Sequence, residues 1–216
     1  MGNDTLFKYE ENNVKIFGFW HIFTINNWKE IVMEQKAKIK KSKLSESSSQ
    51  IFVSVAGDVG SVLNSLPNAT IITPKNEDVF GELPAIKFLH EFCSREEECF
   101  VWYIHAKGVT RPENKCVSDW RRCLEYFMIC QWRLCEQGLF ENDVSGALWN
   151  GNHFHGNFWW ARSSYIRKCK SIEINQNRHQ AEFFLGTGNP KVKNLHETNI
   201  NHYQTRYGYG NFVKIF

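Results

Sequence analysis

One short stretch of the chain combines oxygen-bearing side chains at a spacing suited to a metal ion. Asn76-Glu77-Asp78 places an amide and a carboxylate two residues apart, and in an extended loop such side chains point the same way and can reach one divalent cation. This ligand set favours Mg²⁺ or Mn²⁺ shared with a substrate diphosphate over a cage made only of protein ligands. A solvated loop is the alternative.

A second stretch could act on an anion. His105 and Lys107 follow the apolar run 100–104, and Gly108 comes directly after them. A lysine at the end of a buried strand can neutralise an anionic leaving group as its charge develops. The alternative is a histidine with its hydrogen bonds satisfied and an exposed lysine.

His153 and His155 lie two residues apart, so on extended chain they share a face as metal ligands do. A second histidine pair does not follow, so a binuclear hydrolase site would lack half its ligands. One histidine that joins a metal–diphosphate site, or that hydrogen-bonds a substrate hydroxyl, fits better. The neighbouring aromatic residues 158–160 belong either to the core or to a surface on which a sugar ring stacks.

Glu182 is the last candidate, a carboxylate between Ala181 and two phenylalanines. It serves a site, or it forms an exposed ion pair with Arg178 four residues earlier. The sequence has no Gly-x-Ser-x-Gly elbow, P-loop or Gly-x-Gly-x-x-Gly motif, which argues against the common hydrolases, NTPases and dinucleotide-binding enzymes.

The elements that must position these residues alternate between strands and helices. Apolar runs at 14–20, 51–56, 69–73 and 100–104 predict strands, and 144–149 and 157–161 could pair as two more. Helices are expected from 28, where Asn27 and Glu30 have capping-box spacing, from Pro84, over 118–137 and over 178–185. Strands without a polar face predict an α/β fold with a largely parallel, buried sheet.

The carboxyl ends of these strands gather most of the polar candidates at one edge, where ligands bind in such sheets. We expect residues 1–216 to form one domain, with the tail from about 187 packed on it.

Composition excludes several classes of protein. Apolar residues make up 42% of the chain and aromatic residues 15%, which argues against disorder. A net charge of +3 is too balanced to indicate nucleic-acid binding, and apolar runs stay well short of the ~18 residues of a membrane span. The N-terminus lacks the apolar stretch of a signal peptide. Seven cysteines without a Cys-x-x-Cys pair indicate reduced thiols in a cytoplasmic compartment.

Four segments resemble a known family. FGFWH at 17–21, YIHAKG at 103–108, DWRR at 119–122 and HGNFWWA at 155–161 are similar to small GT-A-type glycosyltransferase domains of bacteria and large DNA viruses, chloroviruses among them. The likeness covers residues 14–186. It implies a GT-A fold, a nucleotide-diphosphate sugar donor, a glycan or glycoprotein acceptor, and Mn²⁺ or Mg²⁺. The chlorovirus likeness implies a UDP-linked donor, a deoxyhexose such as rhamnose, and the host cytoplasm.

The resemblance and the strand ends together imply a set of roles. The nucleoside would contact Phe19, Trp20 and Asp58. The metal would bind Asp78, helped by Asn76 or by a histidine of the 153–155 pair, and the leaving diphosphate would lie against Lys107 and His105. The sugar or acceptor would face His155, Asn157, Trp159 and Glu182. In an inverting reaction Glu182 would be the general base, whereas a retaining reaction needs none. Two other classes remain open, a metal-dependent hydrolase that uses His153 and His155, and a non-catalytic carbohydrate-binding module.

We predict that uridine diphosphate binds more tightly with Mn²⁺ than without it, because the oxygens of Asn76 and Asp78 could hold a cation against the diphosphate. Calorimetry in Mn²⁺ and in EDTA measures the difference. Equal affinities would rule out the metal and leave Lys107 and His105 to carry the charge.

Overall fold

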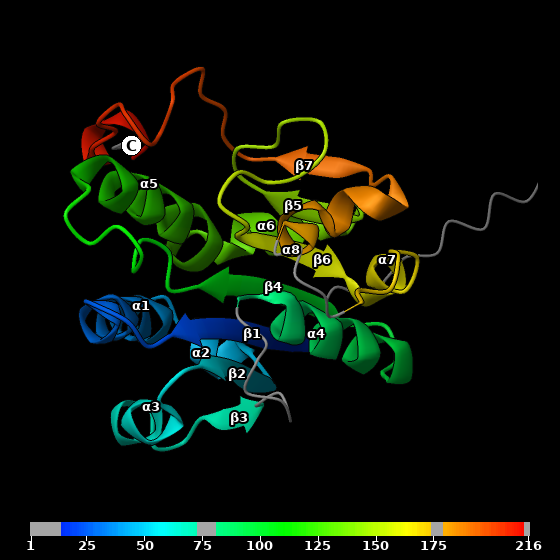
Figure 1. The fold of residues 1–216 in the computed structure, drawn as a ribbon. Coiled ribbons are helices and arrows are strands. Elements are labelled where there is room, and N and C mark those ends of the chain that lie inside the picture. Colours follow the sequence, from blue (N-terminus) through cyan, green and yellow to red (C-terminus); the bar gives the residue numbers. More distant parts are fainter. Residues whose placement is uncertain (1–13, 73–80, 174–178, 214–216) are drawn as a thin grey trace, which may run out of the picture.

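In the computed structural model, which describes residues 14–72, 81–173 and 179–213, seven strands form one sheet in the order β3-β2-β1-β4-β6-β5-β7 (Figure 1). The strands are β1 (Ile16–Phe23), β2 (Gln50–Ala56), β3 (Thr70–Ile72), β4 (Phe100–His105), β5 (Val144–Gly146), β6 (Trp159–Arg162) and β7 (Val192–Asn194). β6 runs antiparallel to its neighbours β4 and β5, and the other pairs are parallel. The predicted α/β fold with a mostly parallel sheet is confirmed.

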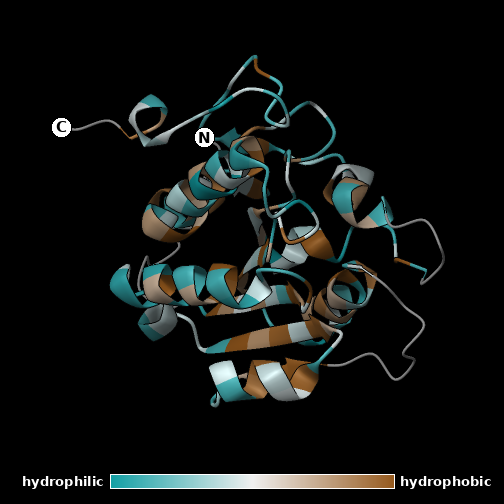
Figure 2. Ribbon diagram, turned by 60° about the vertical axis from the view of Figure 1, so that its left-hand side comes forward, coloured by the Kyte–Doolittle hydropathy of each residue, from teal (hydrophilic) through white to brown (hydrophobic). Residues whose placement is uncertain are grey.

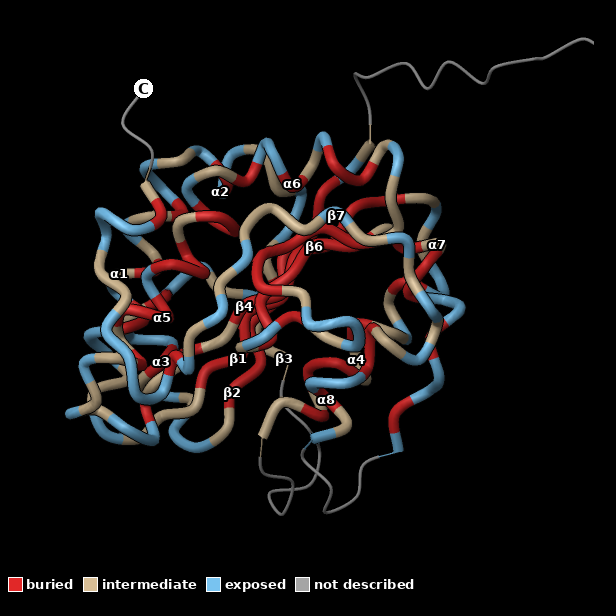
Figure 3. Tube along the Cα trace, turned by 90° about the horizontal axis from the view of Figure 1, so that it is seen from above, coloured by how far each residue is buried: buried red, intermediate tan, exposed pale blue. Residues whose placement is uncertain are grey.

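Helices cover both faces of this sheet. They are α1 (Trp28–Lys41), α2 (Leu44–Ser47), α3 (Val59–Ser65), α4 (Leu83–Arg95), α5 (Lys115–Glu125), α6 (Trp132–Leu139), α7 (Ser163–Ile166) and α8 (Gln180–Phe183). One core lies between the sheet and α1, α5 and α6, and the other between the sheet and α4, α7 and α8. Figure 2 shows the apolar faces of the helices, and Figure 3 shows the buried strands between helices and loops that are partly exposed. Because neither face is open to water, the strands have no polar alternation.

Three local predictions need correction. The helix expected over 118–137 is interrupted by a π-helical turn at Tyr126–Cys130, and an inserted turn of this kind shifts the helical register. Cys123 is therefore buried while Cys130, seven residues later, is exposed. The side chain of Asn27 makes no capping hydrogen bond to α1. The tail contributes β7, a strand parallel to β5 that the sequence did not reveal. All seven cysteines are free thiols in the structure.

A buried polar network joins α1 and α5 to the sheet. Gln35 Oε1 accepts a hydrogen bond from Trp20 Nε1 at 2.9 Å. Gln35 Nε2 donates to the carbonyl of His105 at 3.0 Å and to Glu125 Oε1 at 2.9 Å. Arg121 Nη1 donates to the same Glu125 oxygen at 2.8 Å, and Lys38 pairs with the other. Gln35 and Glu125 are fully buried, so their polar atoms depend on these partners.

We predict that Glu125→Gln lowers the free energy of unfolding by about 3 kcal/mol, because it keeps the shape of the side chain but leaves Arg121 and Lys38 facing a neutral amide. Urea unfolding measures the loss. Glu141→Gln, at an exposed position, is the control and should stay within about 0.5 kcal/mol of the parent. Equal stabilities of the two variants would show that the buried carboxylate is dispensable.

Candidate functional site

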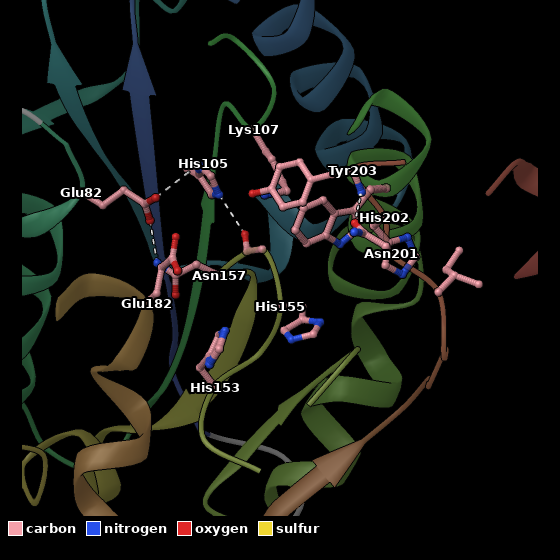
Figure 4. A pocket seen from close by; sticks show the side chains of 13 residues that line it. Glu82, His105, Lys107, His153, His155, Asn157, Glu182, Asn201, His202 and Tyr203 are labelled. Carbon is pink, nitrogen blue, oxygen red and sulfur yellow. Dashed lines mark hydrogen bonds and ion pairs between the residues drawn. The ribbon is translucent and has the colours of Figure 1, made fainter. Parts of the chain in front are cut away.

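A cavity of about 330 Å³ lies at the carboxyl edge of the sheet (Figure 4). Six of the residues that the sequence analysis selected line it: His105, Lys107, His153, His155, Asn157 and Glu182. His105 ends β4, Asn157 precedes β6 and Glu182 lies in α8. Because β6 is antiparallel to β4, its first residues reach the same edge as the last residues of β4. The fold therefore brings together residues that are up to 77 positions apart, from His105 to Glu182.

Glu82 lines this cavity and accepts hydrogen bonds from two other side chains. The sequence analysis did not select it. Its Oε2 accepts from the Tyr103 hydroxyl at 2.9 Å and from Asn157 Nδ2 at 2.6 Å. Asn157 Oδ1 in turn accepts from Trp159 Nε1 at 2.8 Å. Both ends of the Asn157 amide are thus engaged, and its orientation is fixed by partners on two sides.

The Lys107 ammonium lies over an aromatic ring. Its Nζ is 3.7 Å from the centroid of the Trp120 ring, a favourable cation–π contact. Burial lowers the pKa of Lys107 to about 8, although the nearby carboxylates of Glu82 and Glu182 favour the charged form. At neutral pH the cavity therefore holds a desolvated ammonium, which interacts more strongly with an anion than an exposed lysine does.

The histidines around Lys107 are neutral. Burial and the Lys107 ammonium lower the pKa of His105 to about 3, and its Nε2–H donates to the Gly156 carbonyl at 2.9 Å. Its Nδ1 is 3.6 Å from Glu82 Oε1. Burial also lowers the pKa of His153 and of His155. At pH 7 these rings offer hydrogen bonds without positive charge.

The C-terminal tail supplies a wall that sequence reasoning missed. The His202 ring stacks on Trp120, with centroids 5.4 Å apart and an angle of 16° between the rings, and Tyr203 meets Trp120 edge-on. Asn114 Nδ2 donates to the Tyr203 carbonyl at 3.2 Å, and Arg206 forms an ion pair with Asp119. The abundance of Asn, His and Tyr in the tail was the available signal, but its packing on α5 could not be inferred from it.

The other predicted residues lie elsewhere. Phe19 is buried in the core against Phe52, and Trp20 borders a different, mostly apolar cavity beside α1. Trp159 is in the core. Asp58 accepts a hydrogen bond from the Ser61 backbone N–H at the start of α3. Phe19 and Trp20 thus do not line the cavity at the carboxyl edge, because β1 is covered on both faces and its rings pack among the helices.

The predicted metal ligands Asn76 and Asp78 lie outside the described residues. Within residues 14–72, 81–173 and 179–213, no group of three or more His, Cys, Asp or Glu side chains could hold a metal ion. In the same ranges, no helix is long and apolar enough to cross a membrane.

Comparison with known proteins gives a family and two similar folds. The model of a family described as "Domain of unknown function (DUF8361)" matches residues 19–214. "A nucleotidyl transferase from Methanothermobacter thermautotroptrophicus (Mth528)" has a TM-score of 0.46 and 10% identity, with 93% of this chain and 95% of that chain covered. HddC from Yersinia pseudotuberculosis also has a TM-score of 0.46 and 10% identity, with 85% and 91% covered.

At these scores and identities the two structures do not define a function for the chain. A search of curated proteins finds no match. The resemblance to chlorovirus domains has no support in these comparisons.

We predict that the affinity for sulfate, whose charge is constant between pH 7 and 10, falls as the pH rises through about 8. Lys107 is an ammonium below its pKa of about 8 and a neutral amine above it, so the loss should approach about tenfold per pH unit. NMR titration measures the affinity. Lys107→Gln should bind weakly at every pH in this range. A parent protein whose affinity does not change with pH would contradict the role of Lys107.

Proposed function

The chain belongs to the DUF8361 family, and we propose that it is a glycosyltransferase that moves a sugar from a nucleotide-diphosphate donor to a glycan acceptor. The observation that carries the proposal is the desolvated Lys107 ammonium in the same cavity as the carboxylate of Glu182. Breakage of a glycosyl–diphosphate bond places negative charge on the leaving group, and a fixed cation in a partly dry site stabilises that charge.

Each proposed catalytic residue has a separate task. Lys107 contacts the departing diphosphate. Glu182 has a half-exposed side chain and is the general base if the reaction inverts, so it accepts the proton of the acceptor hydroxyl. In the same step the hydroxyl oxygen bonds to the anomeric carbon, and the bond from that carbon to the diphosphate breaks. His105 acts differently from the expectation, because its Nε2–H is engaged with the Gly156 carbonyl. It positions the 156–157 turn instead of contacting the diphosphate.

A divalent cation, Mn²⁺ or Mg²⁺, remains part of the proposal. Asn76 and Asp78 would hold it, and when bound it would act as a Lewis acid on the diphosphate oxygens. Both residues lie outside the described part of the chain, and the proposal rests on the oxygen ligands that they offer. Both the Tyr103 hydroxyl and the Asn157 amide already donate to Glu82, so Glu82 is better suited to hold side chains in place than to bind the ion.

The donor is proposed to be UDP-linked, with a deoxyhexose such as rhamnose as one candidate sugar. The protein is proposed to act in the cytoplasm.

Tyr203 and Phe183 are exposed aromatic rings. Tyr203 lines the cavity, and Phe183 packs edge-on against His153 with ring centroids 4.8 Å apart. Such rings give a sugar an apolar face to stack on, which suits a glycan acceptor.

We predict that Lys107→Ala lowers kcat by about 10²- to 10³-fold, because its contact strengthens as the leaving group becomes charged. Lys107→Arg should recover part of the loss, since a planar guanidinium replaces a compact ammonium. Release of uridine diphosphate from a panel of UDP-sugars with glycan acceptors provides the rate.

The matched control is Lys115→Ala, at the exposed start of α5, which should keep the parental kcat. A raised KM at unchanged kcat would make Lys107 a residue for donor binding alone. Unchanged kinetics in both Lys107 variants would contradict the proposed mechanism.

A further inference from the structure

Asn150, in the loop between β5 and β6, faces the two histidines with a defined end of its amide. Its Oδ1 accepts hydrogen bonds from the backbone N–H groups of Asn152 and His153, at 3.1 and 3.0 Å. A backbone N–H can only donate, so these two bonds identify the oxygen end of the side chain. The NH₂ end is therefore the one that meets the rings, 2.9 Å from His155 Nε2 and 3.5 Å from His153 Nε2.

This contact determines where each ring carries its proton. An amide NH₂ donates and cannot accept, so Nε2 of His155 must accept the hydrogen bond. A neutral imidazole that accepts at one nitrogen carries its proton on the other, and the lowered pKa of both histidines favours the neutral form. His155 thus presents Nδ1–H, and the longer contact favours the same tautomer in His153. Nδ1 of His153 is buried and has no hydrogen-bond partner among the described residues.

These donors share the cavity with other groups suited to an anion. Both histidines, Lys107 and Trp120 line it, and Figure 4 shows the two rings near each other with Lys107 across from them. The indole Nε1–H of Trp120 is also buried without a partner in the described part of the chain. The Lys107 ammonium contributes to the electrostatic environment of the His155 ring. The cavity therefore combines the Lys107 ammonium with two buried N–H groups that have no partner among the described residues, and the carboxylates of Glu82 and Glu182 also line it.

We propose that His155 and His153 are neutral hydrogen-bond donors to a phosphate oxygen of the bound diphosphate, and that Asn150 is the positioning residue that fixes their tautomers. The identity of the anion rests on the proposed function, whereas the tautomers do not. A ring that accepts at Nε2 and is protonated at Nδ1 has no free lone pair for a metal ion. This assignment therefore separates the histidine pair from the metal ligands and from a metal-dependent hydrolase.

Asn150→Asp tests the proposal with little change of shape. The carboxylate can still accept from the backbone N–H groups of residues 152 and 153. It can no longer donate to Nε2 of His155, and instead accepts a hydrogen bond from that nitrogen when the nitrogen is protonated. The matched control is Asn152→Asp, which adds the same charge two residues along the same loop. Thermal unfolding first checks that both variants are folded.

Two measurements then apply to the parent and both variants. Long-range ¹⁵N–¹H NMR of the histidine rings between pH 7 and 9 reports the tautomer and the charge of each ring. We expect Nδ1–H in the parent and in Asn152→Asp, and protonated Nε2 in Asn150→Asp. Calorimetry with uridine diphosphate in EDTA should show about tenfold to a hundredfold weaker binding for Asn150→Asp, and less than about threefold for Asn152→Asp.

The outcomes distinguish this inference from the proposed function. A parent His155 protonated at Nε2, or equal weakening by the two aspartates, would overturn the inference. Tautomers and affinities as expected, with no sugar transferred from any donor, would support an anion site and contradict the glycosyltransferase.

Discussion

Two fully buried polar side chains, Gln35 and Glu125, hold the helices of one face against the end of the central strand. Gln35 donates to the backbone carbonyl of His105, two residues before Lys107. Glu125 ends α5, the helix that also carries Trp120. Because buried polar atoms are costly to leave without partners, α1, α5 and the end of β4 are joined in one arrangement. The relative positions of Lys107 and the Trp120 ring depend on this arrangement.

The single reversed strand β6 is the second constraint on the cavity. In an entirely parallel sheet, the residues that precede a strand lie at the edge away from the ligand site. Reversal places Asn157 beside the end of β4, where Glu82 and Trp159 engage both ends of its amide. The same reversal places the 150–156 loop, with its histidines, at this edge. The positions of three polar cavity residues, His153, His155 and Asn157, thus depend on the direction of one four-residue strand.

The sequence predicted six of the seven strands in the described residues and six of the cavity residues, because apolar runs mark buried strands and polar residues such as His105 and Lys107 directly after a strand mark the carboxyl edge. Phe19 and Trp20 could not be placed in the same way. Nearly every residue of β1 is buried, so the strand has no alternation of apolar and polar residues. Without it, the sequence does not show which side chains reach the cavity. The sequence analysis did not select Glu82 and Trp120, because their place in the cavity depends on contacts with residues that are distant in the sequence. The π-helical turn after Glu125 was missed because its five residues, Tyr126–Cys130, are all apolar and show no period that would reveal the change of register.

The wall formed by Asn201, His202 and Tyr203 has a consequence for the order of events on the ribosome. These residues leave the exit tunnel after the sheet strands and α5, on which they pack. A nascent chain can therefore bury most of its core while the cavity is still open on one side. The ion pair between Arg206 and Asp119 holds this wall against α5. The cavity is therefore complete only once residues 201–206 have been synthesised and have packed on α5.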